Sequence, residues 1–160
     1  MNVPFESLSD SSRIWIYQAN RSLSEAEIQE VNARCETFLT DWTAHGTDLK
    51  AGFKIVYKRF IIIALDEAPQ QATGCSIDAS VHFIQTLEQA YNIVLLDKMN
   101  VTFKQGDYIA YKPLSDFRKM AKDKAVTANT IVFNNLVLTK EELKSLWEVP
   151  ASESWHARFF

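Results

Sequence analysis

The sequence predicts an α+β fold, with a largely antiparallel sheet and helices packed mainly on one of its faces. Residues 59–66 form a mostly apolar run rich in β-branched side chains, which is typical of a strand buried on both faces. Stretches 24–43 and 76–91 carry apolar residues at helical spacing. The predicted elements begin in the order β-α-β-β-α-β, which is the split β-α-β or ferredoxin-like order, and further helices are added toward the C-terminus.

The first strand and the first helix follow from local composition. Residues 13–19 are rich in aromatic and β-branched side chains, which favours a strand. Ser24 and Glu27 have the spacing of a capping box, so a helix is expected to begin there. His45-Gly46 is expected to end this region. Cys35 falls on the apolar stripe of the helix, where a small buried residue is expected.

The centre of the sheet is expected to be followed by a second helix. Residues 49–57 alternate partly, and with the buried run 59–66 they predict either a hairpin or one bent strand. A polar loop follows. The second helix is expected over 76–91, and Ser76 or Asp78 is expected to cap it.

The second half of the chain adds smaller elements. Gln105-Gly106-Asp107 separates two β-rich stretches and predicts a hairpin turn. Thr139 and Glu142 form a second candidate capping box. The expected elements are strands at 94–96, 101–104, 108–111 and 130–133, a helix at 114–122, a helix beginning near Thr139, and an irregular aromatic tail from 149 to 160.

The composition indicates a single globular domain spanning residues 1–160. Hydrophobic residues make up 47% of the chain and charged residues 23%, which is ordinary for one domain of this size. The net charge of −3 gives no overall attraction to nucleic acid or to an anionic membrane. The first residues lack the pattern of a signal peptide, and no apolar run approaches the roughly 20 residues of a spanning helix. We therefore expect a cytoplasmic protein with two free thiols.

The turn Thr73-Gly74-Cys75-Ser76-Ile77-Asp78 is the best candidate site in the sequence. Unpaired amides and the dipole at a helix start favour an anion and lower the pKa of a nearby thiol. Cys75 is therefore the candidate catalytic nucleophile or redox-sensing thiol. The candidate ligand-binding residues are Thr73, Gly74, Ser76 and Asp78. The simpler alternative is structural, with Gly74 permitting a turn, Ser76 or Asp78 capping the helix, and Cys75 packing.

A catalytic thiol would need an imidazole within hydrogen-bond reach. His82 lies about two helical turns from Cys75, which is too far for contact. His45 and His156 could reach Cys75 only through tertiary folding. The scattered Cys and His residues show no metal-binding spacing, so neither a metal nor another cofactor is expected.

Two further segments admit a functional alternative. The basic residues of segment 112–124, interleaved with acidic ones, are typical of a solvated helix face. The alternative is a modest phosphate or nucleic-acid patch, with Tyr108 and Tyr111 nearby for stacking. The tail 147–160 ends on two phenylalanines, and burial of each large aromatic side chain is worth roughly 1.5–3 kcal/mol. We expect the tail to pack on the protein's own core, the alternative being a homodimer formed through it.

Residues 12–21, 73–78, 96–101 and 147–160 together resemble a family of small bacterial proteins of no assigned activity, whose members often carry the label "ABC transporter ATPase". The likeness covers nearly the whole chain and implies a bacterial cytoplasmic protein. An ATP-binding cassette needs G-x-x-x-x-G-K-[ST] to hold the phosphates, and no glycine here is followed by lysine. ATPase activity is therefore not expected, and the resemblance carries over no functional residue.

The sequence favours a non-enzymatic domain that binds a small ligand or a protein partner. This hypothesis depends on the aromatic tail and on the lack of a complete catalytic set. The alternative is a thiol-dependent enzyme or redox sensor, in which Cys75 acts with the helix-start amides and a distant histidine.

Overall fold

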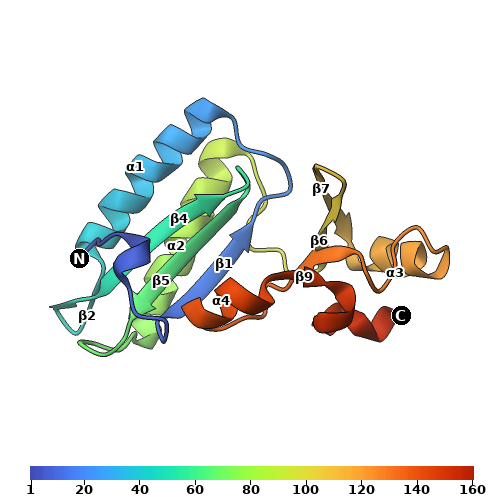
Figure 1. Cartoon of the computed structure of the whole chain (residues 1–160). Coiled ribbons are helices and arrows are strands. Elements are labelled where there is room, and N and C mark those ends of the chain that lie inside the picture. Colours follow the sequence, from blue (N-terminus) through green and yellow to red (C-terminus); the bar gives the residue numbers. More distant parts are fainter. The chain divides into compact units, whose positions relative to one another are not determined.

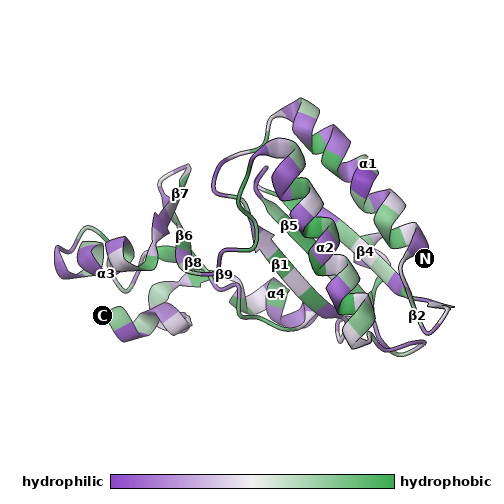
Figure 2. Ribbon diagram, turned by 180° about the vertical axis from the view of Figure 1, so that it is seen from behind, coloured by the Kyte–Doolittle hydropathy of each residue, from purple (hydrophilic) through white to green (hydrophobic).

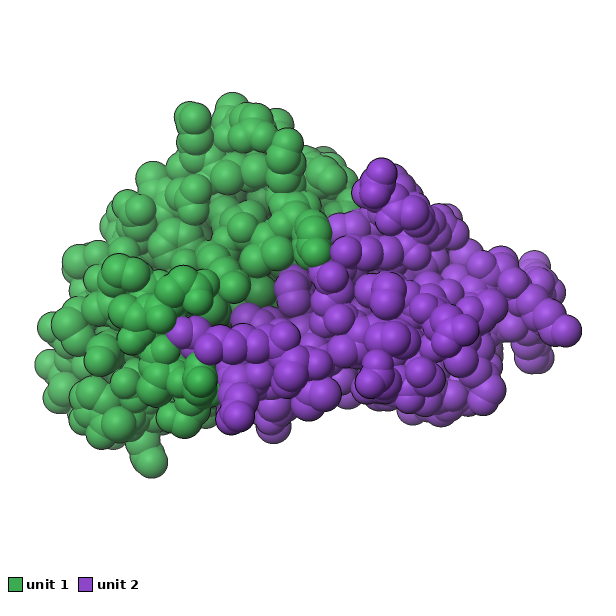
Figure 3. All heavy atoms as spheres, viewed as in Figure 1, with its two compact units in different colours: residues 1–96 green, residues 97–160 purple.

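The computed structural model describes residues 1–160 and confirms the α+β class. The chain folds into two compact units, Met1–Leu96 and Asp97–Phe160, which Figure 3 colours separately. Each unit has its own sheet and its own hydrophobic cluster. That residues 1–160 behave as a single folding domain stays a prediction.

The sheet of the first unit has β5 (Phe60–Asp66) at its centre. β1 (Arg13–Gln18) and β4 (Lys50–Val56) flank β5, and both pair with it in antiparallel register. β1 and β4 therefore run parallel to each other with one strand between them, which is the split β-α-β arrangement. Every residue of β5 except Asp66 is buried, which confirms the predicted strand buried on both faces.

The connection between β4 and β5 is a hairpin rather than a bend in one strand. Tyr57 and Lys58 have φ angles of 54° and 56°, the left-handed conformation that reverses a strand sharply. The Arg59 amide donates to the Val56 carbonyl oxygen at 3.1 Å and closes the turn. This conformation costs about 1–2 kcal/mol at each of the two non-glycine residues, so the packing of the two strands must offset that cost.

Two helices, α1 (Glu25–Asp41) and α2 (Gly74–Tyr91), cover the same face of this sheet (Figures 1 and 2). The capping box predicted at Ser24 is confirmed, because its hydroxyl accepts from the Glu27 amide while the Glu27 carboxylate accepts from the Ser24 amide. Cys35 is buried, as predicted. Burial raises the pKa of its thiol to about 12, so Cys35 is an inert packing residue. The cluster under the two helices includes Val31, Cys35, Leu39, Ile61, Ile63, Leu65, Ile84 and Leu87.

The strand predicted at 94–96 is absent, so the ferredoxin-like order lacks its fourth strand. Asn92 ends α2 in the left-handed conformation. The amides of Leu95 and Leu96 then donate to the Glu88 carboxylate at 2.8 and 3.0 Å, and the Leu95 side chain is buried in the core. Because a carboxylate takes these amides, they do not join a strand ladder.

A small hairpin that was not predicted from the sequence follows α1. Its strands, β2 (Thr43–Ala44) and β3 (Thr47–Asp48), pair in antiparallel register. His45 and Gly46 form the turn, with φ angles of 52° and 74°, and two successive positive φ angles are typical of a two-residue hairpin.

The N-terminal segment runs along the outer edge of β4. The Val3 amide donates to the Ala51 carbonyl oxygen at 2.8 Å, and the Ala51 amide donates to the Met1 carbonyl oxygen at 3.1 Å. A short 3₁₀ helix, η1 (Phe5–Ser7), follows. A Cβ added at Gly52 would lie 2.6 Å from the Val3 carbonyl oxygen, so only glycine permits this approach.

The second unit contains a four-stranded antiparallel sheet in the order β7-β6-β8-β9. The β6–β7 hairpin turns at Gly106, as predicted, with a φ angle of 62°. The Thr139 hydroxyl accepts from the Glu142 amide and caps the last α-helix. The elements of this unit are β6 (Asn100–Gln105), β7 (Tyr108–Pro113), α3 (Leu114–Lys122), β8 (Ile131–Phe133), α4 (Lys140–Leu146) and β9 (Glu148–Pro150).

The C-terminal segment is more regular than predicted, and it packs on the core of its own unit. β9 pairs with β8, and two 3₁₀ helices follow, η2 (Ala151–Glu153) and η3 (Trp155–Phe159). His156 is completely buried, and the Phe159 ring centroid lies 5.9 Å from that of Phe117. These contacts confirm the expectation that the tail packs on the protein's own core, whereas a homodimer formed through the tail stays a prediction.

Candidate functional site

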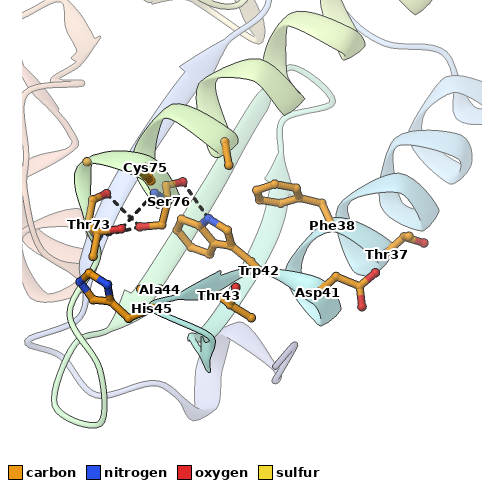
Figure 4. A pocket seen from close by; sticks show the side chains of 12 residues that line it. Thr37, Phe38, Asp41, Trp42, Thr43, Ala44, His45, Thr73, Cys75 and Ser76 are labelled. Carbon is orange, nitrogen blue, oxygen red and sulfur yellow. Dashed lines mark hydrogen bonds between the residues drawn. The ribbon is translucent and has the colours of Figure 1, made fainter.

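A pocket of about 730 Å³ lies where the end of α1, the β2–β3 hairpin and the start of α2 meet (Figure 4). Small-molecule sites usually enclose roughly 300–1,000 Å³, so the volume suits a small ligand. The apolar side chains of Phe38, Trp42, Ala44 and Ala79 line it. Figure 4 shows Asp41 on one side of Trp42 and Thr73, Cys75 and His45 on the other.

Trp42 joins the two helix ends that form the pocket. It is the C-cap of α1 and has an extended backbone, which turns the chain out of the helix. Its indole Nε1 donates to the Ser76 carbonyl oxygen at 2.8 Å, in the first turn of α2. The side chain is 3% exposed and packs against Phe38, with ring centroids 5.6 Å apart. One wall of the pocket is therefore held by a buried hydrogen bond and by aromatic packing.

The start of α2 differs from the prediction in its cap. The helix begins at Gly74 rather than Ser76, and Thr73 is the N-cap in place of Ser76 or Asp78. The Thr73 hydroxyl accepts from the Ser76 amide at 3.1 Å, and the Ser76 hydroxyl accepts from the Thr73 amide at 2.7 Å. Sequence reasoning missed this pair because a capping box is usually recognised by Glu or Gln at its fourth position.

This cap decides which polar groups remain available to a ligand. The Ser76 hydroxyl also donates to the Thr73 carbonyl oxygen at 2.9 Å, and Ser76 is only 3% exposed. Its hydroxyl therefore serves the cap rather than an anion. The amides of Gly74 and Cys75 have no acceptor within the protein, as expected for the first amides of a helix. Gly74 and Cys75 both line the pocket.

The structure brings together two residues that the sequence could relate only through folding. Cys75 and His45 both line the pocket, and both side chains are exposed. No hydrogen bond joins them in this arrangement. The pocket therefore contains the elements of a thiol–imidazole pair, but the pair is not formed.

The other residues weighed from the sequence lie elsewhere. Asp78 and His82 are exposed on α2 and do not line the pocket. His156 belongs to the second unit and is buried there. Asp78 therefore does not contribute to the pocket, and the imidazole of His156 is not exposed to act as a base.

Two charged features lie at different ends of the pocket. Asp41 is the last residue of α1, where the helix dipole is also negative. Gly74 and Cys75 begin α2, where the dipole is positive and the two amides are unbonded. Sequence reasoning missed Asp41 and Phe38 as lining residues, because their proximity to α2 depends on tertiary packing. One signal in the sequence could have predicted the hairpin that borders the pocket. The His45-Gly46 pair lies between Thr43 and Thr47, and this spacing fits a two-residue hairpin turn.

No helix has the length and apolarity needed to cross a membrane. Nowhere do three or more His, Cys, Asp or Glu side chains gather closely enough to hold a metal ion. No family model matches the chain, and neither the curated proteins nor the solved structures contain a match. The resemblance to a bacterial family therefore stays a prediction.

Proposed function

We propose that the pocket binds a small amphoteric molecule with a carboxylate, an apolar part and an amino group, the chemical class of an amino acid. One observation carries this proposal: an apolar hollow has unbonded helix-start amides at one end and the carboxylate-bearing end of α1 at the other. The protein would then act as a ligand-binding domain rather than as an enzyme.

The α2 end of the pocket suits the carboxylate. Two adjacent amides, those of Gly74 and Cys75, are free to donate to it, and the helix dipole adds to the attraction. The exposed imidazole of His45 lies at the same end. A charge-assisted hydrogen bond is worth about 1.5–3 kcal/mol, so two such bonds can fix the orientation of a small ligand.

The middle and the α1 end suit the rest of the molecule. Phe38 and Trp42 offer aromatic surface for an apolar group. Asp41 would accept hydrogen bonds from an ammonium group and would repel a second carboxylate. A ligand with one charge only would satisfy one end and leave the other without a partner, so the amphoteric molecule should bind best.

Three related ligands test this proposal. Phenylalanine carries both charged groups, 3-phenylpropionate lacks the amine, and phenethylamine lacks the carboxylate. In ¹H–¹⁵N spectra, phenylalanine should shift the amides of Gly74 and Cys75 and the Trp42 indole, with saturation, and should bind more tightly than the other two. Equal shifts with all three ligands, or none with any of them, would refute the proposed ligand class.

Gly74 offers a matched pair of variants. Proline is favoured at the first helical position, and the extended conformation of Thr73 (φ −110°, ψ 167°) is compatible with a following proline. Gly74→Pro therefore removes one amide donor while it preserves the helix. We expect phenylalanine to bind about tenfold more weakly to Gly74→Pro, while Gly74→Ala, which keeps the amide, should bind normally. Equal affinities in the two variants would contradict the role of this amide.

The second candidate function is thiol chemistry at Cys75. It is favoured by one observation, that the exposed Cys75 shares the pocket with His45. An imidazolium beside the thiol would stabilise the thiolate and shift its reactivity to lower pH. Site-resolved alkylation of Cys75 by iodoacetamide, measured against pH, tests it. A pH dependence of alkylation that is unchanged in His45→Ala would contradict the thiol function and leave ligand binding as the proposed function.

A further inference from the structure

A second hollow, of about 460 Å³, lies in the second unit between α3 and η3. Arg118, Lys122, Arg158 and Phe159 line it. Three of these four residues are cations and none is acidic, which separates this hollow from the mixed pocket of the first unit. The sequence favoured a solvated helix face for the segment 112–124, and Arg118 and Lys122 are indeed exposed. What the sequence did not relate to that segment is Arg158, 36 residues beyond Lys122.

The cations in this hollow are gathered at an energetic cost. Arg118 and Lys122 are four residues apart on α3, so their side chains share one face of the helix, and like charges at this spacing are mildly destabilising. No carboxylate lies within ion-pair distance of Arg118, Lys122 or Arg158. Asp116, two residues before Arg118, faces about 200° away around the helix. None of the three cations therefore has a direct ion-pair partner within the protein.

The two guanidinium groups are nevertheless positioned. The Cζ atoms of Arg118 and Arg158 lie 5.6 and 5.3 Å from the centroid of the Phe159 ring. Phe159 itself packs on the buried Phe117 ring. Arg158 also lies over Trp155, at 5.1 Å. Cation–π contact orients a guanidinium without consuming the N–H groups at its edge, so these donors stay available to an acceptor.

We propose that this hollow binds the phosphate group of a small phosphorylated molecule, of the size of a mononucleotide. A phosphate monoester carries about −1.5 to −2 charges at neutral pH and three strong acceptor oxygens, which matches two guanidinium groups and one ammonium better than a carboxylate does. The volume exceeds that of a bare phosphate ion and is within the range of small-molecule sites. This site is separate from the pocket of the first unit and does not depend on the function proposed there.

Titrations on the full chain test the inference, with the backbone amides of α3 and η3 and the Trp155 indole as reporters. The probes are adenosine monophosphate, inorganic phosphate, adenosine and a ten-nucleotide oligouridylate. Saturable binding of adenosine monophosphate is expected. Inorganic phosphate should bind at the same residues, and adenosine should not bind, because the phosphate is the recognised group. Tight binding of the oligonucleotide without binding of the mononucleotide would overturn the inference in favour of RNA.

Charge variants decide whether the site is local. Arg118→Gln should weaken adenosine monophosphate binding by about tenfold or more, since it removes a charge-assisted contact, and Arg118→Lys should recover part of the loss. Lys119→Gln is the matched control, because Lys119 is the next residue of α3, is exposed and does not line the hollow. Equal weakening in Arg118→Gln and Lys119→Gln would show diffuse charge attraction and would overturn the site. Absence of binding by all four probes at 10 mM would overturn it as well.

Discussion

Acidification should destabilise the protein through His156. Its imidazole is completely buried, stacked on Trp155 with ring centroids 3.8 Å apart and packed 5.7 Å from the Phe117 ring. Nδ1 lies 2.7 Å from the Ser154 Oγ, whereas Nε2 is buried without a hydrogen-bond partner. Burial, with a smaller contribution from the charge of Arg158, lowers the pKa of His156 from 6.5 to about 4.

The sign and size of the effect follow from these two pKa values. Above pH 6.5 the imidazole is neutral in both the folded and the unfolded chain, so it has no effect on stability. Between pH 6.5 and about 4 only the unfolded chain takes up the proton, so stability falls as the pH falls, and the loss levels off below pH 4. Between pH 7.5 and pH 5 the loss should be about 2 kcal/mol of the free energy of unfolding.

Urea unfolding at pH 7.5 and pH 5, followed by tryptophan fluorescence and circular dichroism, measures this loss. His156→Phe is the comparison variant, because it keeps an aromatic ring between Phe117 and Trp155 but cannot titrate. The natural chain should lose about 2 kcal/mol and the variant less than about 0.5 kcal/mol. The reasoning fails if both lose the same amount, or if the His156 ring protons titrate near the unperturbed histidine pKa of about 6.5.

Three further predictions concern stability. Gly52→Ala should destabilise the protein by about 1–3 kcal/mol in urea unfolding, because the new Cβ would lie 2.6 Å from the Val3 carbonyl oxygen; Gly74→Ala, with open space around it, should be neutral or stabilising. Glu27→Gln should cost about 1 kcal/mol at pH 7, since Glu27 caps α1 and pairs with Arg21 at 2.8 Å. These hydrogen bonds lower the pKa of Glu27 to about 2, so the difference should shrink as the pH falls from 4.5 toward 2; a constant difference would count against the pair. Trp42→Phe should cost about 1–3 kcal/mol, because it removes the buried indole hydrogen bond to the Ser76 carbonyl oxygen and part of a buried ring, and thermal unfolding that is unchanged from the natural chain would contradict this.

Much of the first unit could be predicted from the sequence, because its signals are local and consistent. The apolar run at 59–66 indicated a buried strand, and Ser24 with Glu27 marked the start of α1 by hydrogen bonds that close within one turn. The prediction of a strand at 94–96 was wrong, because the apolar residues of this segment fit a strand as well as a buried loop. The deciding factor was the Glu88 carboxylate, which takes two of its amides from seven and eight residues away.

The candidate site was only half visible in the sequence. Cys75 and Gly74 could be placed at a helix start because caps and turns leave a compositional trace. Their neighbours across the pocket could not, since the Trp42 indole meets Ser76 across 34 residues. The tail shows the same limit, because Arg158 and Arg118 share the Phe159 ring only once η3 has packed on α3. Residue types predict local structure, whereas the contacts between residues far apart in the sequence depend on tertiary packing.

The indole hydrogen bond from Trp42 to Ser76 has a consequence for selectivity. It ties the last turn of one helix to the first turn of the next at 2.8 Å, so the gap between them cannot widen unless a buried donor and acceptor separate. A bulky ligand would have to break this hydrogen bond, and a few new contacts would not recover the free energy lost. The pocket should therefore select ligands by size, and should bind slim molecules more tightly than branched molecules of the same charge.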